Sequence, residues 1–422
     1  MKNNRHMELM SNLIESISMG PFGSDVKVEY FTEKGIPFLS GENLTSIKMN
    51  DRNLKYFPEE KAEKLSKAIV YPGDIVVTHR GTLGQLSYVP DDLKEKRFLI
   101  SQSQFKVTLK KDLVNPVWFA YYFHTKEGQK RLLSFANYVG VPALATATTN
   151  FKGLEIPLPK RAEQDKIADF LSNIDSKIAN NNAISKELES MAKTIYDYWF
   201  LQFEFPDKDG KPYKSNGGKM VWNDQLKQEI PEGWEVDNLY RIADFINGIA
   251  SQKYRPVNIK NKLPVIKITE MHDGFTSKTE FVRDDIDDSH IIHNGDILFS
   301  WSASLETMIW NKGLGGLNQH IFKVIPKADF SKHYVYQQLS SYVINFVLMA
   351  NARKTTMGHI TKDHLEQSRI TIPPKNLRDK FESMVESLYS KITVCDEENQ
   401  ELKSLRDFLL PMLMNGQVTI KD

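Results

Sequence analysis

The segment IPLPKRAEQDKIADFLSNIDSKIANNNAISKELES, which begins at Ile156, and the segment ITIPPKNLRDKFESMVESLYSKITVCDEENQELKS, which begins at Ile370, are two copies of one pattern. Asp165 aligns with Asp379, and the alignment continues without an insertion, always at a separation of 214 positions. Prolines precede both copies and stop any earlier helix. A duplicated helix that tolerates no gap indicates an element kept at fixed length, such as a spacer.

Both copies carry apolar residues at alternating spacings of four and three, which is typical of a coiled coil. The predicted seam residues are Ile167, Leu171, Ile174, Ile178, Leu188, Ile195, Phe381, Val385, Leu388, Ile392, Leu402 and Leu409. Both seams weaken at the same level, at Asn181 and Ser185 in one copy and at Cys395 and Asn399 in the other. Polar residues at such positions often fix the register.

We therefore predict that two helices of about 40 residues, each roughly 60 Å long, pack against each other as an antiparallel pair. The alternative is that the two seams belong to separate bundles, one within each half. The second helix is expected to fray near Pro411 and to end by Gly416.

The segments before the two helices also resemble each other, but their loops differ in length. Gly73-Asp74 matches Gly295-Asp296 at a separation of 222, whereas Phe105 matches Phe322 at 217. Each Gly-Asp pair is followed by strand, polar loop and strand, which predicts a hairpin or adjacent strands. The predicted fold class is α+β, with two α/β domains joined by the two helices and related by an internal pseudo-twofold repeat.

The predicted organisation is a first domain over 1–158, a central spacer helix over 159–203, a connector over 204–232, a second domain over 233–372 and a C-terminal spacer helix over 373–422. The second domain opens with IPEGWEV from Ile230, and the first domain has no such motif. Either the first domain lacks an edge element or the true start lies upstream.

The composition, with 41% hydrophobic and 26% charged residues, is typical of a soluble protein. The N-terminal sequence is too polar for a signal peptide, and the most apolar stretch, SYVINFVLMA from Ser341, is predicted to be core helix. One cysteine, Cys395, excludes a disulfide framework and favours the cytoplasm. A net charge of +1 is a mild argument against nucleic-acid binding. Affinity depends, however, on the local patch of basic residues that meets the phosphates.

Polar loops next to the repeated strands differ between the two halves. Gln and Asn can bind adenine in the major groove of DNA, and Arg can bind guanine, so these loops are candidate base readers. The candidate residues are Thr78, His79, Arg80, Gln102, Gln104, Ser300, Trp301, Asn318, Gln319, His320, Arg353, Lys354, Thr355 and His359. The alternative for each of them is ordinary variation of a solvated loop.

Catalytic motifs are not found in the sequence. No GxxxxGK[ST] phosphate-binding motif occurs. Asn115-Pro116-Val117-Trp118 resembles an NPPY-type methyltransferase motif but lacks its second proline, so it predicts a helix N-cap with proline at the first helical position. His290 and His293 have no third ligand nearby, and neither a metal site nor a catalytic residue is predicted.

Along nearly its whole length, the chain resembles the specificity subunit of type I restriction-modification systems. The most specific passages are IPLPKRAEQDKIADFLSNID from Ile156, its copy from Ile372, and the connector FLQFEFPDKDGKPYKSNGGKMVWNDQLKQEIPEGWEV from Phe200. The resemblance implies a non-catalytic subunit with two target recognition domains, each reading half of a bipartite site in double-stranded DNA.

The resemblance also implies partners that carry the chemistry. These are two methyltransferase subunits, which bring S-adenosylmethionine, and restriction and translocase subunits, which bring ATP and Mg²⁺. No cofactor is expected on this chain itself. A different class of function remains open at this point, namely a non-enzymatic protein-protein scaffold built on the coiled coil.

Overall fold

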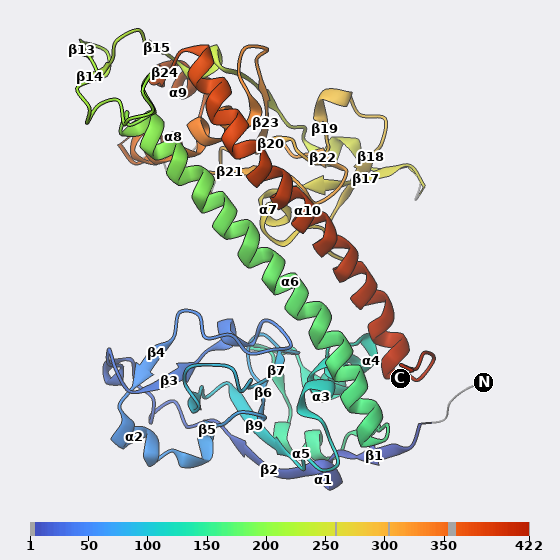
Figure 1. Ribbon diagram of the computed structural model, residues 1–422. Helices are drawn as coiled ribbons and strands as arrows, with labels where there is room; N and C mark the ends of the chain where they lie inside the picture. Colours follow the sequence, from blue (N-terminus) through green and yellow to red (C-terminus); the bar gives the residue numbers. More distant parts are fainter. Residues whose placement is uncertain (1–4, 258–259, 303, 353–359, 422) are drawn as a thin grey trace. The chain divides into compact units, whose positions relative to one another are not determined.

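The computed structural model describes residues 5–257, 260–302, 304–352 and 360–421 (Figure 1). The chain divides into two compact units, of which the first is Met1–Ser176 with Leu402–Asp422 and the second is Lys177–Glu401. Two long helices, α6 (Arg161–Tyr196) and α10 (Lys375–Met414), contribute residues to both units. The boundary between the units therefore does not coincide with the boundary between the two sequence repeats. Each unit contains residues from both repeats.

The first unit contains two four-stranded sheets. The first sheet is antiparallel and has the order β2 (Ile14–Met19), β9 (Gln104–Leu109), β6 (Ile75–Thr78) and β7 (Leu86–Tyr88). The second has the order β4 (Lys55–Phe57), β3 (Ile36–Leu39), β8 (Phe98–Ile100) and β5 (Ile69–Val70), and its β3 and β8 are parallel. Strand β6 is buried on both faces, because Ile75 and Val77 belong to one hydrophobic core and Val76 to another. This explains its continuous apolar sequence.

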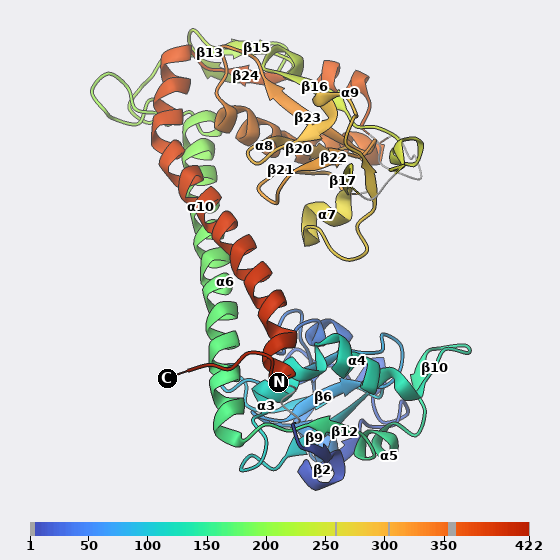
Figure 2. The ribbon, with the colours of Figure 1, turned by 90° about the vertical axis from the view of Figure 1, so that its right-hand side faces the viewer.

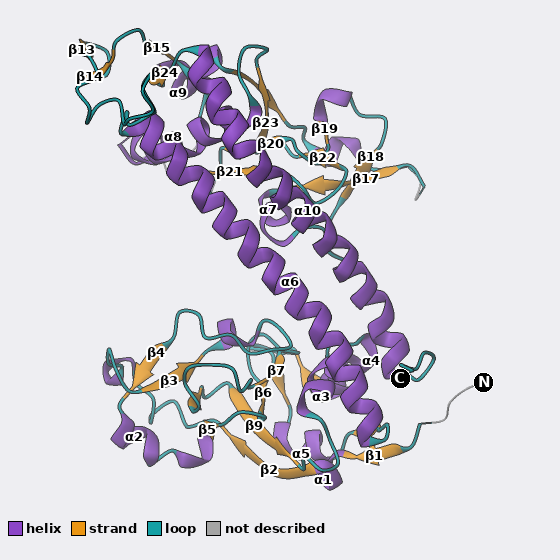
Figure 3. Cartoon of the chain, in the orientation of Figure 1, coloured by secondary structure: helices purple, strands orange, loops and turns teal. Residues whose placement is uncertain are grey.

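Short helices complete the first unit (Figure 3). They are α1 (Met10–Leu13), α2 (Glu59–Glu63), α3 (Pro116–Phe123), α4 (Lys126–Leu132) and α5 (Ala147–Lys152). Helix α3 begins as the sequence predicts, since the Asn115 side chain accepts hydrogen bonds from the backbone N–H groups of Val117 (2.8 Å) and Trp118 (3.2 Å). The predicted N-cap is thus confirmed, with Pro116 at the first helical position.

The second unit repeats this topology strand for strand. Its first sheet has the order β16 (Ala243–Asn247), β23 (Ile321–Pro326), β20 (Ile297–Ser300) and β21 (Glu306–Ile309), and its second has the order β18 (Phe281–Arg283), β17 (Lys262–Ile266), β22 (Gly315–Leu317) and β19 (Ile291–Ile292). Strands β17 and β22 are parallel, as are β3 and β8. The predicted hairpins are confirmed as β6–β7 and β20–β21. The remaining elements are α7 (Ile268–Asp273), α8 (Lys332–Ala352), α9 (Lys362–Gln367) and the connector hairpin of β13 (Met220–Asn223) and β14 (Gln228–Pro231).

A short edge pair is present in both units. Strand β1 (Met7–Leu9) pairs with β12 (Glu155–Pro157), and β15 (Glu235–Asp237) pairs with β24 (Ile370–Ile372), both antiparallel. The idea that the first domain lacks an edge element is therefore wrong. Edge pairing uses backbone hydrogen bonds, so it does not require the IPEGWEV motif that opens the second domain.

The two long helices run antiparallel in each unit. In the first unit, Asp175 of α6 bonds Arg406 of α10 (2.6 Å), and the Arg5 side chain bonds both Glu163, near the start of α6, and the carbonyl of Met414, at the end of α10. In the second unit, Asn181 contacts Asn399 and the ring of Tyr196 lies 6.0 Å from that of Phe381. The alternative of two separate helical bundles is therefore wrong.

The seam contains a satisfied polar layer inside the second unit. Asn181 and Asn399 are only 2% and 4% exposed. The Asn181 amide donates to Asn399 (3.1 Å) and to Glu398 (2.7 Å), while the Asn399 amide donates to Asn182 (2.9 Å). A shifted register would leave these buried amides without partners, which is how a polar layer selects one register.

All the seam residues predicted from the sequence are buried or partly buried in the structure. Those that are buried are Ile167, Leu171, Ile174, Ile178, Phe381 and Val385, and those that are partly buried are Leu188, Ile195, Leu388, Ile392, Leu402 and Leu409.

Helix α10 ends at Met414, and Gly416 follows with φ of +76°, so the expected end of the helix is confirmed. The expected fraying near Pro411 is wrong, because the helix continues through that residue. The apolar stretch from Ser341 is helical, as expected, but Ile344 and Leu348 are 69% and 62% exposed. Only one face of α8 packs on the core, so apolar residues on the other face stay in contact with solvent. No helix of the described residues is long and apolar enough to cross a membrane.

One hydrogen-bonding position is conserved between the two copies with a different side chain. Gln164 donates to the carbonyl of Pro159 (2.9 Å), and Arg378, 214 positions later, donates to the carbonyl of Pro373 (3.0 Å). Both side chains are buried. Each ties the first turns of its long helix to the loop before it, so glutamine and arginine serve the same purpose at this position.

Replacing Arg378 by alanine is expected to destabilise the second unit by about 3 kcal/mol. The substitution leaves the carbonyls of Pro373 and Asp329 without their donors and removes a guanidinium 4.1 Å from the ring of Phe330. Arg378→Gln should lose clearly less, because glutamine performs the same role at Gln164. Urea unfolding of both variants checks this, and equal losses for alanine and glutamine would contradict it.

Candidate nucleic-acid interface

Four loops of the first unit meet beside the ends of β6 and β9. We call residues 20–23, 79–81, 101–104 and 138–144 the first loop cluster. Backbone hydrogen bonds hold it together: His79 N–H donates to Ser103 (2.8 Å), Leu144 N–H to His79 (2.8 Å) and Gly20 N–H to Gln104 (2.8 Å). The cluster is therefore a connected frame.

The second unit builds the same frame from different residues. We call residues 247–251, 300–302, 318–321 and 360 the second loop cluster, excluding the undescribed residues nearby. Trp301 N–H donates to His320 (3.2 Å), Ile360 N–H to Trp301 (3.0 Å) and Gly248 N–H to Ile321 (3.1 Å). These three bonds correspond one by one to those of the first loop cluster. The side chains presented on the frame differ, since His79 in one cluster occupies the position of Trp301 in the other.

A glycine closes each frame where two backbones approach. A Cβ on Gly20 would lie 2.0 Å from the carbonyl oxygen of Ser101, and a Cβ on Gly248 would lie 2.1 Å from that of Asn318. Any other residue would overlap a backbone atom, so both positions require glycine for reasons of space.

Four of the predicted base-reading residues have an internal role. Thr78, Gln104, Ser300 and Asn318 are all buried. The Thr78 hydroxyl donates to Gln85 (3.0 Å), and the Gln104 side-chain oxygen accepts from the Ser101 N–H (2.9 Å). In the second cluster, Ser300 accepts from the Glu306 N–H (3.2 Å) and Asn318 from the His320 N–H (3.3 Å). The geometry does not support direct base contact by these four, because their side chains are buried and each makes an internal hydrogen bond, although Nε2 of Gln104 has no partner among the described residues.

The other described candidates of the first cluster are accessible. Arg80 and Gln102 are exposed, and the Arg80 guanidinium makes no hydrogen bond or ion pair within the described part of the chain. His79 is half-buried with Nε2 3.0 Å from the Gln102 carbonyl. Burial lowers the pKa of His79 below its ordinary value, so the ring is neutral at neutral pH and offers hydrogen bonding without charge.

The second cluster presents a different set. Trp301, Gln319 and His320 are partly buried. The Trp301 indole N–H donates to Asn247 (3.0 Å), and its ring lies 5.6 Å from that of His320. The remaining candidates, Arg353, Lys354, Thr355 and His359, lie outside the described residues.

Acidic residues are missing from the segments that build the two clusters. The chain has 54 Asp and Glu residues, but none occurs in 16–24, 75–90, 97–111 or 128–154 of the first unit, or in 245–269, 297–305, 307–328 or 330–362 of the second. Glu306, which separates two of these segments, bonds Ser300 through its backbone N–H. Part of each segment is buried strand, yet the exposed loops belong to the same segments. The net charge of +1 does not reveal this segregation, whereas the distribution of acidic residues along the sequence would have singled out these segments.

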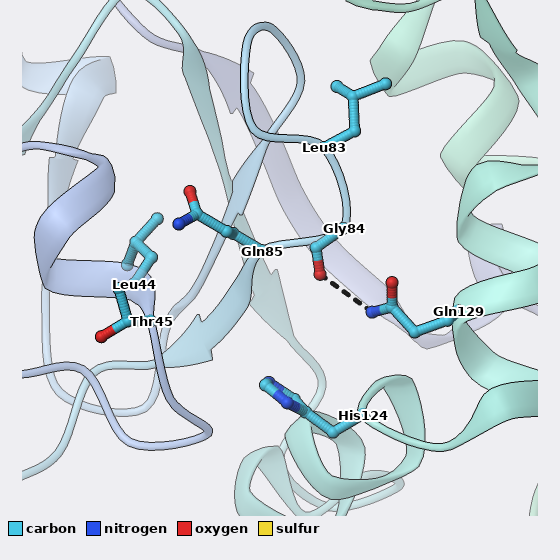
Figure 4. A pocket seen from close by; sticks show the side chains of 7 residues that line it. All are labelled: Leu44, Thr45, Leu83, Gly84, Gln85, His124 and Gln129. Carbon is cyan, nitrogen blue, oxygen red and sulfur yellow. Dashed lines mark hydrogen bonds between the residues drawn. The ribbon is translucent and has the colours of Figure 1, made fainter. Parts of the chain in front are cut away.

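A pocket in the first unit does not form part of a catalytic arrangement. It has a volume of about 340 Å³ and is lined by Leu44, Thr45, Leu83, Gly84, Gln85, His124 and Gln129 (Figure 4). Its polar groups already bind the backbone, because Gln129 donates to Gly84 (2.8 Å) and the His124 ring contacts the carbonyl of Leu86 (2.7 Å). Among the described residues, no group of three side chains could hold a metal ion.

Comparisons with known proteins agree with this architecture. The family model of the type I restriction modification DNA specificity domain matches residues 29–190 and 231–404. The type I restriction enzyme MjaIX specificity subunit of Methanocaldococcus jannaschii is 27% identical, covering 94% of this chain and 90% of the relative. The HindI specificity subunit of Haemophilus influenzae is 21% identical over 87% and 90% of the two chains.

A solved structure shares the fold. The S subunit of a type I restriction-modification system from M. genitalium superposes with a TM-score of 0.55 at 16% identity, covering 97% of this chain and 96% of the other. Because the specificity-domain model matches both halves and covers most of the residues, the chain belongs to the family of type I restriction-modification specificity subunits.

Proposed function

We propose that this chain recognises DNA for a type I restriction-modification complex, with each domain reading one half of a bipartite site. The observation that carries the proposal is the pair of loop clusters. Both use the same backbone hydrogen bonds, but one presents His79, Arg80 and Gln102 and the other Trp301 and Gln319. The same backbone arrangement with different side chains is suited to two domains that recognise different DNA sequences.

The distribution of charge supports a polyanionic ligand. Phosphate contacts supply most of the affinity for DNA, and carboxylates near the backbone would oppose it. The loop clusters are drawn from segments without Asp or Glu, and Arg80 is exposed and unpaired within the described residues. A protein-binding scaffold, the competing function, gives no reason for removing carboxylates from both clusters.

The two long helices are proposed to fix the spacing between the half-sites. Their duplication without a gap and the buried layer of Asn181 and Asn399 support this, because both features preserve length and register. We propose that two methyltransferase subunits with S-adenosylmethionine, and restriction and translocase subunits with ATP and Mg²⁺, assemble on this chain in the cytoplasm. Methylation and cleavage of DNA would then belong to those partners.

DNA binding by the complex with methyltransferase subunits is expected to weaken steeply as salt rises. Mapping the methylated bases in the host genome gives the site, and anisotropy of a labelled duplex carrying that site then gives affinity against salt concentration. Arg80→Ala should reduce the slope of log K against log salt by about 1, the loss of one phosphate contact. Lys211→Ala, an exposed lysine of the connector, is the control and should leave the slope unchanged.

If the affinity for the mapped duplex does not change with salt concentration, the proposed DNA recognition is wrong. Assembly with methyltransferase subunits in the absence of any DNA binding would instead support the scaffold.

A further inference from the structure

The strands β10 (Ala136–Asn137) and β11 (Ala143–Leu144) form a hairpin of the first unit (Figure 2). Its tip carries exposed apolar side chains. Tyr138, Val139 and Val141 are 64%, 87% and 56% exposed. Gly140 between them adopts φ of +74°, which turns the chain at the tip. Three adjacent apolar side chains in water are unfavourable for an isolated protein, so they indicate a surface that is covered in a complex.

The tip is fixed in place by its neighbours. Ala136 pairs with Leu144 and Asn137 with Ala143, and the Asn137 side chain accepts a hydrogen bond from the Val139 N–H (2.9 Å). These bonds restrain the strands of the hairpin and the start of its turn, which lowers the entropic cost of binding.

The tip also lies beside the exposed cation of the first loop cluster. Gly81 N–H donates to Pro142 (2.8 Å), and Arg80 forms a backbone bridge with Ala143. Residues 128–154, which contain the whole hairpin, have no Asp or Glu. An apolar tip next to an unpaired guanidinium, on a segment without carboxylates, complements DNA, which offers phosphates beside apolar base faces.

We propose that Tyr138 and Val139 form an apolar wedge that enters a groove of the first half-site and stacks against a base step. This inference rests on the proposed function of DNA recognition. Groove-binding proteins commonly insert apolar side chains between base steps, and they bend the duplex as they do so. The wedge contacts bases through their apolar faces while Arg80 contacts an adjacent phosphate. In the second unit, the equivalent positions, 216 residues later, fall on 353–359, outside the described residues.

Affinity measured against salt separates the wedge from a phosphate contact. The Tyr138→Ala, Val139→Ser double variant, in complex with methyltransferase subunits, should bind the mapped duplex about 10-fold to 100-fold more weakly with an unchanged salt slope. Arg80→Ala should instead change the slope. Trp222→Ala is the matched control, since Trp222 is a 61% exposed aromatic residue of the connector hairpin, and it should leave both quantities unchanged.

A fluorescent base reports on stacking directly. With 2-aminopurine placed in turn at each adenine of the first half-site, the wild-type complex should change the fluorescence at one step, and the double variant should not. Wild-type affinity in the double variant, together with salt-dependent binding by the wild type, would overturn the wedge while leaving the proposed function intact. Loss of assembly with the methyltransferase subunits in the double variant would overturn it too, because the tip would then be a protein contact. Absence of DNA binding by the wild type would count against the proposed function itself.

Discussion

Gly20→Ala is expected to destabilise the first unit by about 3 kcal/mol and to weaken DNA binding through the first loop cluster. The new Cβ would lie 2.0 Å from the carbonyl oxygen of Ser101 and 2.9 Å from that of Gln104. Both are backbone atoms of the loop that Gly20 itself bonds, so relief requires the loop to move as a whole. Forced overpacking of this kind costs about 1–3 kcal/mol, and more when backbone must shift.

Urea unfolding and DNA affinity of the variant, measured together, test this expectation. Gly248→Ala should have the same effect on the second unit, because its Cβ would lie 2.1 Å from the carbonyl oxygen of Asn318. Gly153→Ala is the matched control, since the nearest atom lies 3.5 Å away and φ is −81°, which alanine accepts. Equal stability of the Gly20 and Gly153 variants would show that the close approach is not required.

Lengthening both long helices by one heptad is expected to change the spacing of the two half-sites and not their sequences. Seven residues inserted after Ile184 and seven after Cys395 keep the seam in phase, since the coiled-coil pattern repeats every seven residues. The insertion points face each other, because Asn181 contacts Asn399. Seven residues add about 10 Å of helix, which corresponds to about three base pairs of DNA.

The measurement is binding to duplexes in which the two half-sites are separated by spacers of increasing length. Seven residues inserted after Asp224, in the turn of the connector hairpin, form the control and should leave the preferred spacer unchanged. If the heptad variant keeps the original spacer, the helices do not determine the spacing. If it requires different half-site bases, the readers themselves have been disturbed.

The long helices and the hairpins could be predicted because their signals are local and repeated. The spacing of Ile167, Leu171 and Ile174 specifies one apolar helix face, and Pro159 and Pro373 specify where helices cannot continue. The duplication predicted that the two halves of the sequence form the same secondary-structure elements in the same order. The strand orders of the two four-stranded sheets and of the edge pair agree with this in both units.

Which polar residues face solvent could not be predicted in the same way. Gln102 and Gln104 have the same chemistry two positions apart, yet one is exposed and the other is 1% exposed with its oxygen bound to Ser101. The stretch SYVINFVLMA was predicted to be core because it is the most apolar of the chain, whereas Ile344 lies outside the packed face of α8. The polarity of a side chain indicates whether burial is favourable for it, but tertiary packing determines which residues are actually buried.

The sequence by itself therefore determined the repeat, the two helices, their polar seam positions and the family resemblance, because each depends on residue spacing within one segment. The tertiary structure alone decided that Asn181 meets Asn399, that Met7–Leu9 supplies the edge strand, and that the hairpin tip at Tyr138 lies next to Arg80. These three results join residues far apart in the chain. Such contacts depend on how loops of variable length close over the sheets, and the spacing of residues within one segment carries no information about that closure.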